Sequence, residues 1–354
     1  MKINKILIIS LIILIFVGIV ATMFSEGFVS NAPLEPKENV SIAVTGDVMF
    51  ARNMPGVLSL DSSPFSGVSN VTSNVDLLLI NFENAATYSD NALKDDVPLK
   101  CSPNYVPLAK ANNNTVASLA NNHAFDYGIE GMQDTVKYLK DAGITPIGAG
   151  NSQDEAQQAV VQDINGRKIT ILNYMDADNF AEYSYEVMPY ANGSNPGYSA
   201  YNYEDASKQI SQNNDSDLII AYLHFGNEYS TSPNENQVKI AHELIDLGAD
   251  VVIGSHPHVP QGIEMYNGKP IFYSLGNFIF DQSNPATHVA YFVEIDLVGD
   301  VGQCTVYPIY ISNYLPQFMD AQSGSNLLSN LYPQSGQLDI TGGGIGKLNF
   351  NLTN

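Results

Sequence analysis

Residues 217–228 read DLIIAYLHFGNE, an apolar run that ends in a group of polar side chains. A short apolar run bounded in this way predicts a buried strand. A segment of helical periodicity, Glu235–Leu247, follows and ends before Gly248, and a second apolar run occupies Asp250–Gly254. Glycine commonly follows the end of a helix, because it adopts the left-handed conformation of the cap without strain. Strands that alternate with helices indicate an α/β domain rather than an all-α or all-β one.

The same alternation extends over residues 40–313, which we predict to form one such domain. Further candidate strands are Ser41–Thr45, Asp76–Ile80, Thr115–Leu119, Ile144–Gly148, Lys168–Tyr174 and Ile271–Ser274, and further candidate helices are Ile129–Ala142 and Tyr203–Gln212. Two late segments, Thr287–Leu297 and Gln303–Ile311, alternate apolar and polar residues and predict an antiparallel hairpin. Residues 314–354 are rich in Ser, Gly, Gln and Asn, so we expect a loosely ordered or peripheral tail there.

The N-terminus predicts a membrane anchor. Two lysines precede the apolar run Ile6–Phe24, and a helix needs about 20 apolar residues to span a bilayer. We therefore expect residues 1–24 to form a signal-anchor helix and residues 25–39 to form a linker. The positive-inside rule keeps the lysines in the cytoplasm and places the domain on the extracytoplasmic side of the cell membrane. Cleavage at small-residue triplets after the run is the alternative.

The charge balance limits the partners. The chain has 37 acidic and 15 basic residues, a net charge of −22, which argues against nucleic-acid binding. An anionic substrate would need a local source of positive charge, such as a metal ion.

The two cysteines, Cys101 and Cys304, form one disulfide or remain free, and the sequence leaves both outcomes open.

Polar residues gather where the predicted strands end, which is where open α/β sheets place their ligand sites. Asp47 follows the first strand, and Asn81 and Glu83 follow the second, two residues apart and therefore on one face of an extended segment. Asn122 and His123 follow the third strand. The imidazole of His123 has a pKa near working pH, so it is the candidate general acid.

Histidines end two later strands. His224 closes the run at 217–223, with Glu228 shortly behind it, and His256 and His258 follow the strand at 250–254. Two histidines separated by one residue point the same way in extended backbone and can converge on one cluster. Imidazoles mixed with carboxylate and amide oxygens suit Zn²⁺, Mn²⁺ or Fe rather than Ca²⁺. The residues predict a site for a divalent metal and leave open whether it holds one ion or two.

Six motifs in order carry a resemblance to a known family. They are GDVMFAR, NFEN, LANNHAFDYG, HFGNEY, GSHPHVPQGIE and YSLGNFIFDQ, and together they span about residues 41–282. In order and spacing they resemble the CapA family of poly-γ-glutamate capsule proteins. That family is similar to the calcineurin-like metallophosphoesterases, and the resemblance implies their four-layer αββα sandwich with metals between the strand-end loops.

The resemblance also implies roles for residues. By analogy the metal ligands are Asp47, Glu83, Asn122, His224, His256 and His258, and the catalytic residue is His123. Apart from the analogy, we predict Arg52, Asn81, Glu228 and Asn277, which lie within the motifs, as substrate-binding residues. One motif departs from the phosphoesterase pattern, because Asp-x-His reads Asp47-Val48-Met49 here and a thioether replaces the imidazole. This departure puts ordinary two-metal phosphoester hydrolysis in doubt.

Three functions follow as hypotheses. The resemblance favours a role in synthesis, export or retention of poly-γ-glutamate or a similar anionic polymer, beside membrane-embedded synthase or export subunits. The ligand set alone favours a metal-dependent hydrolase that acts on a phosphoester or an amide. The substitution at Met49 and the acidic composition favour a polymer-binding module that has lost catalysis.

Overall fold

The computed structural model describes residues 38–94, 97–180, 184, 186–332 and 338–352, which belong to one compact body. The expected anchor, and all of the expected linker except its last two residues, lie outside these ranges. Within them, no helix combines the length and the apolar character that a bilayer crossing requires.

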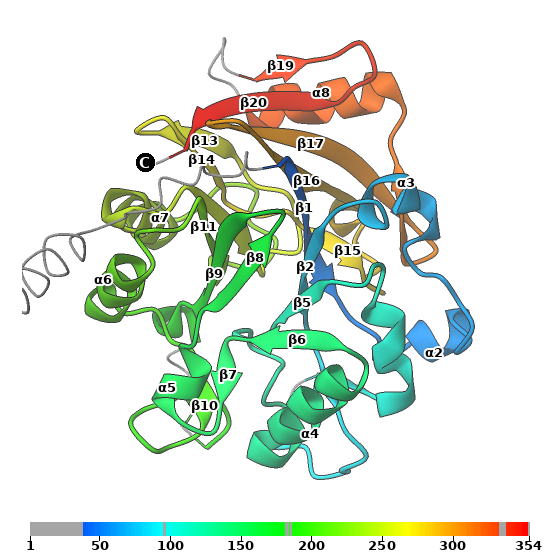
Figure 1. Cartoon of the computed structure of the whole chain (residues 1–354). Helices are drawn as coiled ribbons and strands as arrows, with labels where there is room; N and C mark the ends of the chain where they lie inside the picture. Colours follow the sequence, from blue (N-terminus) through cyan, green and yellow to red (C-terminus); the bar gives the residue numbers. More distant parts are fainter. Residues whose placement is uncertain (1–37, 95–96, 181–183, 185, 333–337, 353–354) are drawn as a thin grey trace, which may run out of the picture. The chain divides into compact units, whose positions relative to one another are not determined.

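Two large β-sheets form the body (Figure 1). In the ten-stranded sheet the order is β19-β20-β17-β16-β1-β2-β5-β6, with β15 paired to β1 and β18 paired to β17. Strands β1, β2, β5 and β6 run parallel to one another. The pairs β1 with β16, β16 with β17 and β17 with β20 are antiparallel. The bounds are β1 Val40–Val48, β2 Leu77–Phe82, β5 Thr115–Ser118, β6 Ile144–Ile147, β15 Asn277–Ile279, β16 Val289–Val298, β17 Val301–Ser312, β18 Leu315–Phe318, β19 Asp339–Ile340 and β20 Gly346–Asn351.

The second sheet has six strands in the order β13-β14-β12-β11-β9-β8, and β9, β11, β12 and β14 run parallel to one another. Its bounds are β8 Val160–Ile164, β9 Arg167–Met175, β11 Leu218–His224, β12 Val251–Ser255, β13 Ile263–Tyr266 and β14 Lys269–Phe272. Two short pairs complete the strands, β3 Ala85–Ala86 with β4 Lys100–Cys101, and β7 Ala149–Gly150 with β10 Gly197–Tyr198.

The sheets pack face to face, because alternate strand residues of both sheets share one buried core. Ile42 and Val44 of β1 and Ile220 and Ile253 of the second sheet belong to it. Tyr222 crosses between the sheets and donates its hydroxyl to the carbonyl oxygen of Thr45 at 2.9 Å. The facing sheets thereby bring the carboxyl ends of β1 and β2 close to those of β11 and β12.

Helices cover the outer faces. Helix α4, Gly128–Asp141, packs on the large sheet, and α6, Tyr203–Gln212, and α7, Glu235–Leu247, pack on the second sheet (Figure 1). A capping box on Asn234 begins α7, and Gly248 ends it at a φ of 116°. A further helix near the C-terminus is α8, Ala321–Leu331. Shorter helices are α2 Met54–Val57, α3 Ser69–Thr72 and α5 Gln153–Ala156, with 3₁₀ turns at η1 Ser66–Val68, η2 Pro103–Ala109, η3 Ala177–Phe180 and η4 Pro285–His288.

The α/β class, the eight candidate strands, the three candidate helices and the late hairpin are therefore confirmed, with small shifts at their ends. The segment after Asn313 differs from the peripheral tail that we expected. It contributes β18, α8 and β20, and Leu348 and Phe350 of β20 are buried against the core between the sheets. Cys101 and Cys304 are both buried and unbonded.

Asp296 on β16 gives a first prediction. Partial burial, helped by the charge of Glu294 and opposed by Lys347, raises its pKa from 3.8 to about 6. The Asp296 carboxyl binds its proton more tightly in the folded chain than in the unfolded chain. The stability that the protonated carboxyl contributes is therefore lost as the pH rises through about 6. Discounted for exposure, the effect is about 1 kcal/mol. Asp296→Asn should therefore raise the melting temperature at pH 8 by about 2 °C.

The same variant should melt like the wild type at pH 4, where the carboxyl of the folded wild type is protonated. Asp300→Asn, an exposed change at the turn of the same hairpin, is the matched control. A gain of equal size at both pH values would contradict the linkage argument, and calorimetry at the two pH values checks it.

Candidate metal centre

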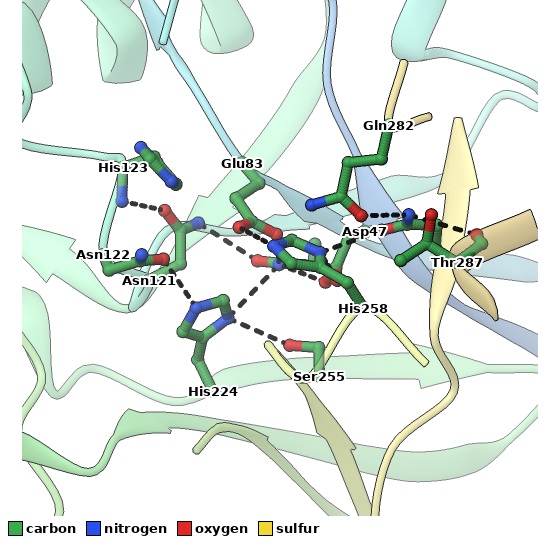
Figure 2. A network of polar contacts seen from close by, with 12 residues as sticks. Asp47, Glu83, Asn121, Asn122, His123, His224, Ser255, His258, Gln282 and Thr287 are labelled. Carbon is green, nitrogen blue, oxygen red and sulfur yellow. Dashed lines mark hydrogen bonds and ion pairs between the residues drawn. The ribbon is translucent and has the colours of Figure 1, made fainter. Parts of the chain in front are cut away.

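Three potential metal ligands meet where the strands of the two sheets end. Asp47 lies near the end of β1, Glu83 directly follows β2, and His224 ends β11. Each offers one ligand atom within 4.8 Å of the others, and all three side chains are buried. Figure 2 shows these side chains directed toward a common point, with His258 beside Asp47. The predicted ligands therefore lie together at the carboxyl ends of the strands, where open α/β sheets place their ligand sites.

Asn81 holds the two carboxylates in place. Its Nδ2 donates to Asp47 Oδ1 at 2.8 Å and to Glu83 Oε2 at 2.9 Å, and its Oδ1 accepts from Asn121 Nδ2 at 3.0 Å. Asn121 is itself fixed, because its Oδ1 accepts from the backbone N–H of His123 at 3.1 Å. The amide of Asn81 consequently turns its donors toward the acidic groups. It is fully buried inside the centre rather than on a substrate-facing surface.

His224 is a neutral imidazole. Its Nε2 lies 2.8 Å from Asn122 Oδ1, and its Nδ1 lies 3.1 Å from Ser255 Oγ. Since an amide oxygen only accepts, the Nε2–H donates and Nδ1 keeps its lone pair. Burial lowers the pKa of His224 well below 6.5, and nearby His256 and His258 lower it further. Asn122, predicted as a ligand, lies in the centre with its oxygen facing His224.

His258 and His256 complete the cluster from the turn after β12. His258 Nδ1 lies 3.0 Å from Asp47 Oδ2 and 2.9 Å from Asn277 Oδ1, and its Nε2 lies 3.8 Å from Glu83 Oε1. His256 is buried, and burial lowers its pKa to about 3. Among the described residues its Nδ1 has no hydrogen-bond partner.

The backbone of these two histidines differs from the expectation. They have φ values of 101° and 59°, in the left-handed half of conformational space, so the extended geometry that we assumed is wrong. Their rings still gather, with centroids 6.2 Å apart. A turn, not a strand, therefore aims them at the centre. Such strain, of order 1 kcal/mol or more per residue, persists only where the surroundings enforce it.

The pKa values of the two carboxyl groups, Asp47 and Glu83, shift in opposite directions. Burial raises the pKa of Glu83 well above its usual value, and the charge of Asp47 raises it further. Burial also acts to raise the pKa of Asp47, but the hydrogen bond and charge of His258 outweigh it and the pKa is lowered. Within the described chain Glu83 Oε1 accepts no hydrogen bond. Without a cation a carboxyl group with so raised a pKa keeps its proton, and a metal ion beside Oε1 would take the place of that proton.

This donor set fits a divalent transition metal. Carboxylates and imidazole nitrogens are the ligands that such ions take. Glu83 Oε1 and His256 Nδ1 are buried polar atoms that lack a hydrogen-bond partner among the residues that the structure describes. Met49 offers no further imidazole, and its sulfur accepts a hydrogen bond from the backbone N–H of Ala51 at 2.8 Å. The donor set present is therefore sufficient for one ion.

His123 lies in the same cluster and pairs with Asp126. Its Nδ1 lies 2.7 Å from Asp126 Oδ2. Burial lowers the pKa of His123, although the Asp126 charge opposes that effect. The imidazole is thus neutral near pH 7, with its Nδ1–H fixed on a carboxylate and its Nε2 left as the nitrogen that can exchange a proton.

The remaining predicted residues lie at the rim or behind the ligands. Arg52 forms an ion pair with Asp281 and stacks over Phe280, 5.4 Å from the ring centroid. It borders a cavity of about 270 Å³ that Tyr229 and Gln282 also line. Glu228 is exposed. Asn277, which we predicted to contact substrate, is buried and supports His258 from behind.

One loop at the centre was not predicted from the sequence. Strand β9 ends at Met175, Asp176 follows it, and η3 then places the ring centroid of Phe180 5.0 Å from that of His256 and 6.2 Å from that of His224. The signal was present, because residues 176–180 read DADNF directly after a predicted strand. Phe180 therefore packs against both imidazoles.

Comparison with known proteins agrees with the motif pattern. Residues 41–282 match the family model described as bacterial capsule synthesis protein PGA_cap. The chain belongs to this family. The matched range contains every residue assigned above to the centre and its rim.

Curated members of the capsule synthesis family are clearly similar. The chain is 33% identical over 282 residues to the capsule biosynthesis protein CapA of Bacillus anthracis, covering 76% of this chain and 67% of that protein. It is also 33% identical over 283 residues to the PGA biosynthesis protein CapA of Bacillus subtilis, covering 78% and 73%. A probable polyglutamine synthesis accessory protein of Mycobacterium tuberculosis is 30% identical over 268 residues, covering 72% and 70%.

A solved structure is also similar. The calcineurin-like phosphoesterase YfkN of Bacillus subtilis aligns with a TM-score of 0.45 at 14% identity, over 90% of this chain and 93% of that one.

Proposed function

We propose that this protein assists synthesis, export or surface retention of poly-γ-glutamate or a similar anionic polymer, through a domain that binds one divalent ion. Mn²⁺, Zn²⁺ and Fe²⁺ suit the donor set. Asp47, Glu83, His224 and His258 would hold the ion, with His256 beside them. The observation that carries the proposal is Glu83 Oε1, buried next to a second carboxylate and without a hydrogen-bond donor in the described chain.

The membrane location is part of the proposal. Residues 1–24 would anchor the protein and hold the domain outside the cytoplasm, beside membrane-embedded synthase or export subunits. The support for this location is the apolar run Ile6–Phe24 behind two lysines. The support for synthase partners is that the relatives are named as biosynthesis proteins. The facing sheets with helices on their outer faces support the metallophosphoesterase-like αββα sandwich.

Metal content tests the centre. The full chain, purified in detergent and equilibrated with Mn²⁺, should carry about one ion per chain by elemental analysis. The double variant His256→Ala, His258→Ala should carry less than a tenth of that, because losing even a supporting group of a metal site weakens affinity about 10- to 100-fold. His242→Ala is the control, since this partly exposed histidine stacks on Tyr266 away from the centre.

Equal metal content in the wild type and the double variant would contradict the proposed metal centre. The polymer role is tested separately, by deleting the gene in a host that makes a surface polymer and restoring it with each variant. Unchanged polymer after deletion would contradict that role.

The His123–Asp126 pair favours hydrolysis as a second candidate function. When bound, the ion supplies Lewis-acid chemistry. Asp126 fixes the Nδ1–H of His123, so that Nε2 moves the proton of the reacting group. His123→Gln should keep the metal and lower turnover of an activated phosphodiester by about 100-fold or more. If His123→Gln turned the phosphodiester over as fast as the wild type, or if the wild type showed no turnover, hydrolysis by this pair would be contradicted and a binding role would remain.

A further inference from the structure

A buried lysine lies beside the His123–Asp126 pair. The Lys94 side chain is only 5% exposed, and its Nζ lies 4.0 Å from Asp126 Oδ1. The other oxygen of that carboxylate lies 2.7 Å from His123 Nδ1. Lysine is almost never buried to this extent without a charged neighbour, and Asp126 is that neighbour here.

The loop that carries Lys94 is fixed to the centre by its backbone. The carbonyl oxygen of Asp126 accepts the N–H of Leu93 at 2.8 Å and that of Lys94 at 3.4 Å. On the far side of the loop, the N–H of Leu99 donates to Asp126 Oδ2 at 2.6 Å. One aspartate thus orients the histidine and holds the lysine loop against it.

The ammonium of Lys94 lies near the imidazole of His123. The two oxygens of the Asp126 carboxylate contact Lys94 Nζ and His123 Nδ1, so only this one carboxylate separates the ammonium from the imidazole. In a buried site such a charge acts far more strongly than on the surface.

Two features of this chain make a fixed cation useful here. Met49 stands where the phosphoesterase pattern has an imidazole, and its sulfur is bonded to the Ala51 N–H. A protein of net charge −22 needs local positive charge to draw in an anion.

We propose that Lys94 is a substrate-binding residue, which holds a carboxylate or phosphate oxygen of an anionic substrate beside His123. The inference rests on the proposed function, because it presumes that the metal centre binds such a substrate. Lys94 would supply a point charge and N–H donors, and Asp126 would set the positions of both Lys94 and His123.

Anion titration tests the inference. The Mn²⁺-loaded full chain is titrated calorimetrically with inorganic phosphate and, separately, with tetra-γ-glutamate, so that the two anion classes are compared. Lys94→Met should weaken binding of the preferred probe by about 10- to 100-fold, because a charge-assisted hydrogen bond is lost. Lys94→Arg should bind within a few-fold of the wild type. Metal content should be the same in all three proteins.

The outcomes separate this inference from the proposed function. Wild-type affinity for both probes in Lys94→Met, or no anion binding by a metal-loaded wild type, overturns the role of Lys94 alone. Loss of metal from Lys94→Met also overturns it, since the lysine would then support the centre. A wild type without metal overturns the proposed function instead. If Lys94→Met does not fold, Lys94→Gln takes its place.

Discussion

Glu83→Gln is expected to abolish metal binding and yet leave the metal-free protein more stable than the wild type. The glutamine oxygen can accept from Asn81 as Glu83 Oε2 does, and the amide N–H₂ would lie where Oε1 faces His258 Nε2. The change removes a carboxylate that is buried next to Asp47. Relief of about 1–2 kcal/mol should raise the melting temperature in EDTA by about 4 °C.

With metal the order should reverse. Losing a carboxylate ligand should weaken Mn²⁺ affinity by on the order of 100-fold or more, so the variant gains no stability from the ion. Glu228→Gln is the matched control, because that carboxylate is exposed and acts on Glu83 only through its charge. Paired melts with Mn²⁺ and with EDTA measure both effects. A Glu83→Gln variant stabilised by Mn²⁺ as much as the wild type would place the ion elsewhere.

The parts of the centre that follow strands could be predicted from the sequence. Asp47, Glu83 and His224 each end an apolar run, and parallel strands bring such ends to one edge of a sheet. Their convergence therefore follows from topology and needs no knowledge of side-chain packing. The hairpin of β16 and β17 was predictable for a similar reason, because its period-two pattern is local.

What could not be predicted depends on contacts between distant segments. Strand β20 pairs with β17 although more than 30 residues lie between them, and the polar residues in that interval concealed the short alternation around Leu348 and Phe350. Lys94 carries no local signal, because its loop is placed by the backbone and carboxylate of Asp126. The positive φ values of the two histidines likewise depend on surroundings that enforce them.

Asn81 shows the same limit within the centre. Its spacing from Glu83 put both side chains on one face, and we read the amide as a substrate contact. The amide instead donates to Asp47 and Glu83, and Asn121 sets its orientation. An amide donor between two carboxylates replaces part of the positive charge that an ion would supply, so stability and metal binding are coupled through this residue.

Asn81→Asp should make the fold depend on metal. The change removes both donated hydrogen bonds and adds a third buried carboxylate, a loss of about 3–5 kcal/mol without an ion. An ion bound at the centre would compensate much of it. The shift in melting temperature between EDTA and Mn²⁺ should therefore be several degrees larger in Asn81→Asp than in the wild type.

Asn84→Asp is the matched control for this prediction. Asn84 is as buried as Asn81, but it accepts from the N–H of Phe50 and contacts the sulfur of Cys101, outside the group of ligands. Its replacement should lower the melting temperature equally with and without Mn²⁺. If Asn81→Asp behaved in the same way, the amide would be an ordinary buried hydrogen-bonding group. A larger metal-dependent shift at position 81 alone requires the ion to lie among Asp47, Glu83 and this side chain.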